Sequence, residues 1–183
     1  IQWVGLSPFN DTYGFVSNGD LTEENGGPFD MQGMADYLQE NSDASLCLET
    51  EFPDRPDGLV LFEDATDFEV PDSQIQILDT GLIYTETASG SCDFGEVFTT
   101  DGRITELNID LVEDDGVFIL YNASYLWNNE AFQEHADDYT ALVDQILEPL
   151  DEAKMAELNA QVDVQGESAD EVAKQYLEEI GVL

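Results

Sequence analysis

The stretch CDFGEVFTTDGRI, residues 92–104, carries the clearest structural pattern in the chain. Its side chains alternate in character from residue 92 to residue 98, which is typical of a β-strand. The polar TTDG that follows is typical of a turn. A second stretch, ETEFPDRPDGL at 49–59, directly follows the apolar run SLCL, which predicts a buried strand. The proline and the apolar face that come next predict a helix.

Further strands and helices are predicted on both sides of these two stretches. Strands alternate with helices up to about residue 115, and only helices follow Asn128, so the sequence predicts an α/β unit with a helical tail. Ser168 with Glu171 predicts a capping box at the last helix. The strands are expected at 1–6, 45–52, 73–78, 92–98 and 109–115, the helices at 31–41, 55–66, 80–90, 129–150, 151–163 and 168–181, and a polar, turn-rich segment at 17–29.

The composition indicates a folded and strongly acidic protein. The 183 residues suffice for one domain or two small lobes, and a hydrophobic fraction of 42% with ten phenylalanines can build a core. Four basic residues face 42 acidic ones, for a net charge of −38. These charges are spread along the chain, which predicts a solvated acidic surface. Such a surface repels nucleic acid and anionic membranes, and it suits high salt, where self-repulsion is screened.

Arg55 and Arg103 are the only cations in the first 150 residues. A buried arginine can join several carboxylates, whereas a lone arginine in a cleft can hold a ligand carboxylate through two hydrogen bonds. Both readings stay open for each residue at this point. Lys154 and Lys174 are predicted to be surface charges on helices, with Asp170 and Lys174 forming an i,i+4 pair.

The sequence assigns no catalytic residue, metal site or cofactor, and we predict that the protein is not an enzyme. The spacing of a calcium-binding loop is absent, and so are the glycine patterns of nucleotide-binding loops. Among so many acidic residues, a pair of carboxylates has almost no specificity for a hydrolase, although a salt-adapted hydrolase remains a third hypothesis. A catalytic triad would need His135, which falls on a predicted surface helix.

Cys47 and Cys92 both fall in predicted strands of the same region. They are either two unrelated buried thiols or one disulfide formed in an oxidising compartment. Two cysteines are too few for a zinc site without histidine.

Three aromatic residues fall at predicted strand ends and loops, namely Tyr13, Phe98 and Tyr121. Core packing is the usual role of such residues. The functional alternative is that the rings converge on a cleft and hold a quaternary ammonium group, which can form no hydrogen bond but is attracted to aromatic faces. A ligand with a carboxylate at its other end would also need a cation, which Arg55 would supply.

Five stretches of the chain resemble a known family in their order. The chain resembles the substrate-binding proteins of osmoprotectant ABC transporters, which bind glycine betaine, carnitine, choline or proline betaine. The motifs GEVFTTDGRI and LNAQVDVQG are the most specific, and a cysteine pair also occurs in the family at the positions of Cys47 and Cys92. The stretches are PFNDTYGFV at 8–16, ETEFPDRPDGL at 49–59, CDFGEVFTTDGRI at 92–104, LVEDDGVFILYNAS at 111–124 and the chain from 155 to 183.

The resemblance implies a class II periplasmic-binding-protein-like α/β fold, in which two lobes close around the ligand. Residues 1–8 would be a hinge-crossing strand, residues 9–107 a complete second lobe, and residues 108–183 the mostly helical return to an incomplete first lobe. The chain would then be an extracytoplasmic receptor, lipid-anchored or periplasmic, whose anchor segment lies outside this sequence.

The resemblance also implies the site and the partners. Tyr13, Phe98 and Tyr121 would form part of an aromatic cage for the quaternary amine, and Arg55 would lie near the carboxylate end. Arg103 would brace the structure, against Asp101 or Glu96. A membrane permease would be the protein partner, and nucleic acid would not be one. The alternative is a lobe without ligand binding that self-associates through its C-terminal helices.

Overall fold

A five-stranded mixed sheet forms the centre of the segment between Thr12 and Ile119 in the computed structural model, which describes residues 1–183. The strand order is β4-β3-β5-β2-β6. Strand β3 pairs in parallel with β4 and β5, and β2 pairs antiparallel with β5 and β6. The strands are β2 (Tyr13–Asn18), β3 (Leu46–Leu48), β4 (Ile75–Ile77), β5 (Phe94–Phe98) and β6 (Ile109–Leu111).

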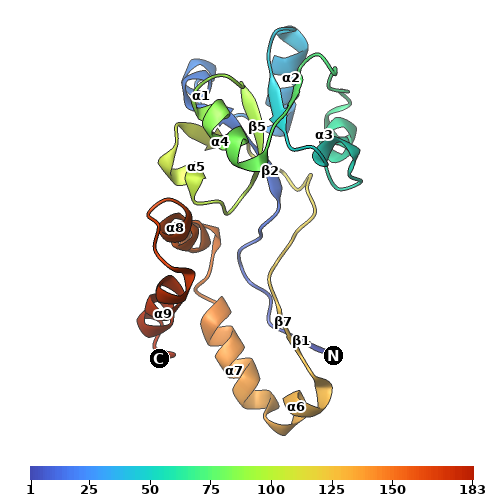
Figure 1. The fold of residues 1–183 in the computed structure, drawn as a ribbon. Helices are drawn as coiled ribbons and strands as arrows, with labels where there is room; N and C mark the ends of the chain where they lie inside the picture. The colour runs from blue at the N-terminus through green and yellow to red at the C-terminus, as the bar shows by residue number, and fades with distance from the viewer. The chain divides into compact units, whose positions relative to one another are not determined.

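Helices cover both faces of this sheet (Figure 1). Helices α2 and α3 lie over the face that carries Phe15 and Phe94, and α4 lies over the opposite face, where Tyr84 packs on Val97. Strand β2 is buried along its whole length, as expected for a strand covered on both faces. The helices of this unit are α1 (Gly19–Asn25), α2 (Met31–Glu40), the 3-10 turn η1 (Phe52–Asp54), α3 (Leu59–Thr66), α4 (Thr80–Ala88) and α5 (Arg103–Glu106).

The strands predicted at 45–52, 73–78, 92–98 and 109–115 are confirmed, with shorter bounds, as are the helices predicted at 31–41, 55–66 and 80–90. The turn-rich prediction for 17–29 was wrong over its first half, where α1 forms. The Asn18 side chain caps this helix by accepting hydrogen bonds from the Asp20 and Leu21 N–H groups. Gly26, in the left-handed conformation, ends it. The segment was predicted as a loop because the residue types that cap helices, such as asparagine and glycine, are also typical of turns.

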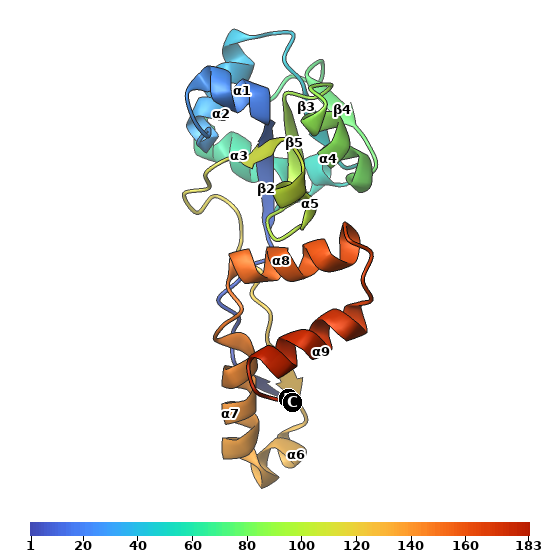
Figure 2. The same ribbon diagram turned by 90° about the vertical axis from the view of Figure 1, so that its left-hand side faces the viewer.

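A second unit comprises Ile1–Asp11, Thr100–Gly102 and Leu120–Leu183. It contains four helices and an antiparallel ribbon of two strands. Figure 2 shows this unit from another side. The helical pattern predicted after Asn128 is confirmed, and Ser168 caps the last helix by accepting the Glu171 N–H. Lys174 pairs with Glu178 at 3.7 Å, rather than with the predicted Asp170. The elements are β1 (Gln2–Val4), β7 (Tyr125–Trp127), α6 (Asn129–Glu134), α7 (Ala136–Leu147), α8 (Glu152–Asp163) and α9 (Ala169–Glu179).

Two motifs far apart in the sequence meet within this unit. The Asn159 side chain donates a hydrogen bond of 2.8 Å to the Thr100 carbonyl. A Cβ atom at Gly102 would lie 2.2 Å from the backbone nitrogen of Ala160, so only glycine fits there. The TTDG and LNAQ motifs therefore belong to one packing contact. No helix of the chain is both long enough and apolar enough to cross a bilayer.

The two units of the structure differ in extent from the predicted lobe of residues 9–107. Because β6 pairs with β2, the unit that contains the sheet continues to Ile119. The assignment of 1–8, 9–107 and 108–183 to the hinge and lobes of a receptor stays a prediction.

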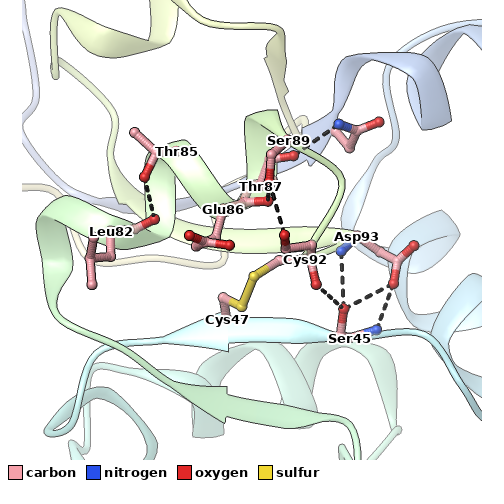
Figure 3. The surroundings of a disulfide bond; sticks show 11 residues. Ser45, Cys47, Leu82, Thr85, Glu86, Thr87, Ser89, Cys92 and Asp93 are labelled. Atoms are coloured by element: carbon pink, nitrogen blue, oxygen red, sulfur yellow. Dashed lines mark hydrogen bonds between the residues drawn. A yellow bond between two sulfur atoms is a disulfide. The ribbon is translucent and has the colours of Figure 1, made fainter.

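Cys47 and Cys92 form a disulfide, which confirms one of the two alternatives (Figure 3). It joins β3 to the loop between α4 and β5, and both cysteines are fully buried. Hydrogen bonds from the Ser45 N–H and hydroxyl to the Asp93 carboxylate, at 2.7 and 3.1 Å, hold the same junction. The crosslink thus fixes the start of β5 against β3.

Replacing both cysteines, Cys47→Ala and Cys92→Ala, should lower the free energy of unfolding by about 4 kcal/mol. The reason is that the crosslink closes a loop of 45 residues and so restricts the unfolded chain. Urea unfolding followed by circular dichroism measures the change. The oxidised wild-type protein, treated identically, is the reference, and an unchanged urea midpoint would contradict the prediction.

Candidate functional site

Several chain segments end or begin at one edge of the five-stranded sheet. Because β3, β4 and β5 are parallel, their carboxyl ends lie at the same edge, where Glu49 follows β3 and Thr80 follows β4. Phe98 is the last residue of β5 and lies opposite Tyr13, the first residue of β2. In open α/β sheets, ligands bind outside the carboxyl ends of the strands. This edge is therefore the candidate site.

Three rings gather at this edge and are called the aromatic set: Tyr13, Phe52 and Phe98. The Tyr13 ring lies 5.2 Å from the Phe98 ring and 5.1 Å from the Phe52 ring, measured between centroids. Phe52 and Tyr13 are buried, and Phe98 is half-buried. The structure thus brings together two of the three predicted cage residues and adds Phe52, which no sequence pattern had indicated.

Arg55 approaches the aromatic set from the turn after η1. Its guanidinium carbon lies 5.5 Å from the centroid of the Tyr13 ring. Its Nε and Nη2 donate to the two carboxylate oxygens of Asp57, at 2.9 and 2.8 Å. Gly58 makes this turn possible, because a Cβ there would lie 2.2 Å from the Phe52 carbonyl oxygen. The RPDG motif therefore builds a turn in which arginine and aspartate form a bidentate ion pair.

Strands β3 and β5 diverge at the candidate site. Their ladder pairs Leu46 with Phe94 and Cys47 with Gly95, and no pair follows. Beyond this point, side chains replace the missing backbone partners. The Glu96 carboxylate accepts the Glu49 N–H at 2.9 Å, and the Tyr84 hydroxyl accepts the Phe98 N–H at 3.1 Å.

Arg103 stacks on one of these two side chains. Its guanidinium carbon lies 3.8 Å from the centroid of the fully buried Tyr84 ring. A cation over an aromatic face at this distance is a favourable contact. Glu96, one of the two partners expected for Arg103, is instead held by the Glu49 N–H. Through Tyr84, Arg103 supports the backbone that carries Phe98.

Glu96 is a buried carboxyl group without an ion-pair partner. Only 2% of its surface is exposed. Burial raises its pKa to about 8, and the negative charge of Glu49 adds to this rise. The hydrogen bond from the Glu49 N–H and the positive charge of Arg55 lower the pKa and so oppose the rise. Glu49 itself accepts a hydrogen bond of 3.1 Å from the Thr80 hydroxyl. Strongly shifted acids of this kind are concentrated at functional sites.

The charges around Tyr13 also act on its hydroxyl group. Burial raises the pKa of Tyr13, Arg55 opposes this effect, and Glu49, Glu96 and Asp57 add to it. Tyr13 therefore remains a neutral ring with a hydroxyl donor at physiological pH.

Tyr121, the third predicted cage residue, belongs to the other unit of the chain. It is 42% exposed, and its N–H donates to the side-chain oxygen of Asn10. Its role as a ligand contact stays a prediction.

Four residues of the candidate site were missed or misread from the sequence: Glu49, Phe52, Tyr84 and Glu96. One signal was available for Glu96, since a glutamate stands inside the otherwise apolar strand FGEVF, on the same face as Phe98. No local signal pointed to Tyr84, which acts through a hydroxyl group 14 residues from its partner.

Comparison with known proteins decides the family. Residues 1–179 match the family described as the substrate binding domain of the ABC-type glycine betaine transport system. The chain belongs to this family. It is 31% identical to a glycine-betaine-binding protein of Pseudomonas aeruginosa, over all of this chain and 60% of that protein. This chain therefore spans well under two thirds of the length of that relative.

Solved structures confirm the periplasmic-binding-protein-like α/β fold. Apo YehZ from Escherichia coli matches with a TM-score of 0.78 and 26% identity, over 99% of this chain and 66% of that one. The structure described as a glycine betaine/carnitine/choline ABC transporter matches with a TM-score of 0.80 and 20% identity, over 97% of this chain and 63% of that one. The family resemblance read from the sequence motifs is thereby confirmed.

The buried Glu96 should make the protein less stable as the pH rises. An unfolded glutamate loses its proton near pH 4.5, whereas folded Glu96 keeps its proton up to about pH 8. The folded state binds more protons between these values, so stability falls with pH, by at most about 1.4 kcal/mol per pH unit. Glu96→Gln should remove this loss and stabilise the protein at pH 8, as measured by urea unfolding from pH 5 to pH 9.

Glu69→Gln is the matched control, because Glu69 is exposed in the same unit. Its stability curve should run parallel to that of the wild-type protein. If the Glu96→Gln curve also ran parallel to wild type, the assignment of a shifted acid would be wrong.

Proposed function

We propose that this chain is part of an extracytoplasmic receptor of an ABC importer that binds a quaternary ammonium osmoprotectant. The observation that carries the proposal is the aromatic set at the carboxyl edge of the sheet, with Tyr13 and Phe98 at 5.2 Å from each other. Family membership supports it, because the family is a substrate-binding domain of glycine betaine transport. A membrane permease would be the partner, and the receptor would carry out no chemical reaction.

Aromatic faces suit this ligand for a physical reason. A quaternary ammonium has no N–H to donate, so attraction to the ring faces and exclusion of water must supply the affinity. Tyr13 and Phe98 would contribute ring faces, and we retain Tyr121 as a further proposed contact on the family resemblance. Phe98 offers the ring face without a phenolic hydroxyl group.

The proposed role of Arg55 changes with its geometry. A ligand carboxylate would have to share the guanidinium with Asp57, which already holds it through two hydrogen bonds. We therefore propose that Arg55 orders the RPDG turn and contributes its charge to the site through the pair with Asp57.

Calorimetry on the full-length protein with glycine betaine, carnitine and choline tests the proposal. At least one of these ligands should bind, and Tyr13→Leu should weaken its binding by about tenfold or more, because it removes a ring face worth about 1–2 kcal/mol. Tyr37→Leu is the matched control, since Tyr37 is a partly buried tyrosine of the same unit that packs on Phe29 and Phe94 instead. Failure of all three ligands to bind would refute the proposed function.

Self-association is a second candidate, favoured by one observation on the β1–β7 ribbon. Trp3 and Leu126 are cross-strand neighbours that are 65% and 53% exposed. On the other face of the ribbon, Val4 is buried and Trp127 stacks on Tyr139 of α7 at 4.2 Å. An exposed apolar face of this kind is typical of a surface that contacts other protein.

Sedimentation velocity on this 183-residue chain tests the second candidate. If the ribbon mediates self-association, the chain should sediment as a dimer or larger species, and Trp3→Ser with Leu126→Ser should return it to a monomer. Val164→Ser, at an exposed apolar residue of the same unit, should leave the sedimentation unchanged. A wild-type monomer at all concentrations would exclude this candidate.

A further inference from the structure

The charges around the aromatic set do not balance. Four ionisable side chains act on the Tyr13 hydroxyl: Arg55 is positive, Glu49 and Asp57 are acidic, and the buried Glu96 gains its negative charge only as the pH rises to about 8. Arg55 and Asp57 form a bidentate pair, so their charges compensate each other. Two carboxyl groups, Glu49 and Glu96, are left over.

These two carboxyl groups are held in place by hydrogen bonds, without any cation. Glu96 accepts the Glu49 N–H, and Glu49 accepts the Thr80 hydroxyl. Neither forms an ion pair with a lysine or arginine. A buried acid without a cation costs stability, which proteins tolerate mainly where the group has a function.

The position of Glu96 connects it with the rings. Glu96 and Phe98 are two residues apart on β5, so their side chains leave the same face of the sheet. Tyr13 lies opposite Phe98 on the neighbouring strand. A positive ligand on the aromatic set would therefore lie close to a carboxyl group that lacks a counter-charge.

We propose that Glu96, assisted by Glu49, selects the charge of the ligand, so that this site prefers a quaternary ammonium cation without a carboxylate, of the choline type, over a zwitterion such as glycine betaine. The inference rests on the proposed function, because it assumes that the aromatic set holds the ammonium group. A cation would supply the missing positive charge. The carboxylate of a zwitterion would meet two acids and an arginine that already holds Asp57.

The preference should depend on pH in a defined direction. The groups that face Glu96 are Glu49 at the end of β3 and Arg55 after η1, and Tyr13 lies on β2. A bound cation favours the ionised form of Glu96, so binding releases a proton and affinity rises as the pH rises towards about 8 and above. Neither choline nor glycine betaine changes its charge between pH 6.5 and 9, because a quaternary ammonium carries no proton and a carboxylate titrates well below this range. The pH dependence of the affinity would therefore report on the protein.

Calorimetry on the full-length protein with choline and with glycine betaine, at pH 6.5 and pH 9, tests the proposal. Choline should bind about tenfold or more tightly than glycine betaine at pH 9, and its affinity should rise about tenfold from pH 6.5 to pH 9. Glu96→Gln should abolish this rise and weaken choline binding at pH 9, although it stabilises the fold. Glu69→Gln should behave as wild type.

The outcomes separate the two proposals. If glycine betaine binds as tightly as choline or more tightly, charge selection by Glu96 is refuted and the proposed function stands. If no quaternary amine binds, both are refuted. If Glu96→Gln fails to fold, Glu49→Gln replaces it, because that variant keeps the backbone N–H that Glu96 accepts, and it should also lower the affinity for choline. The comparison of choline with glycine betaine on the wild-type protein needs no variant.

Discussion

The divergence of β3 and β5 is the constraint on which the candidate site depends. Two parallel strands that separate leave backbone N–H groups without ladder partners, and a buried N–H without a partner costs free energy. In this protein two side chains take over: Glu96 accepts the Glu49 N–H, and Tyr84 accepts the Phe98 N–H. Both acceptors thus stabilise the point where the two strands separate.

The disulfide and the two arginines make further contacts around the point where β3 and β5 separate. Cys47 and Cys92 hold β3 and the start of β5 together just before the strands separate. Arg103 lies over Tyr84, and Arg55 pairs with Asp57 in the turn that follows β3. In a chain with 42 acidic residues, the two cations of the first 150 residues therefore both stabilise segments next to the candidate site. Each does so through a different contact.

Much of the fold could be predicted from local pattern. The apolar run around Leu46 predicted a buried strand, and alternation of side-chain character around Ile75 and Phe94 predicted two more. Helix α1 could not be predicted, because Asn18, Gly19 and Gly26 are equally typical of turns. Its formation depends on contacts such as the hydrogen bond between Ser17 and Thr22, which form only in the folded unit.

The sequence by itself determined the family, the α/β class and the candidate ring residues Tyr13 and Phe98, because motifs and periodicity are properties of neighbouring residues. Only the tertiary structure decided how charge is distributed around those rings. Arg55 was a candidate carboxylate anchor until its pairing with Asp57 was known. Glu96 was one of 42 acidic residues until its burial was known. The physical reason is that the energy of a charge depends on its burial and its partners, which chain folding alone brings together.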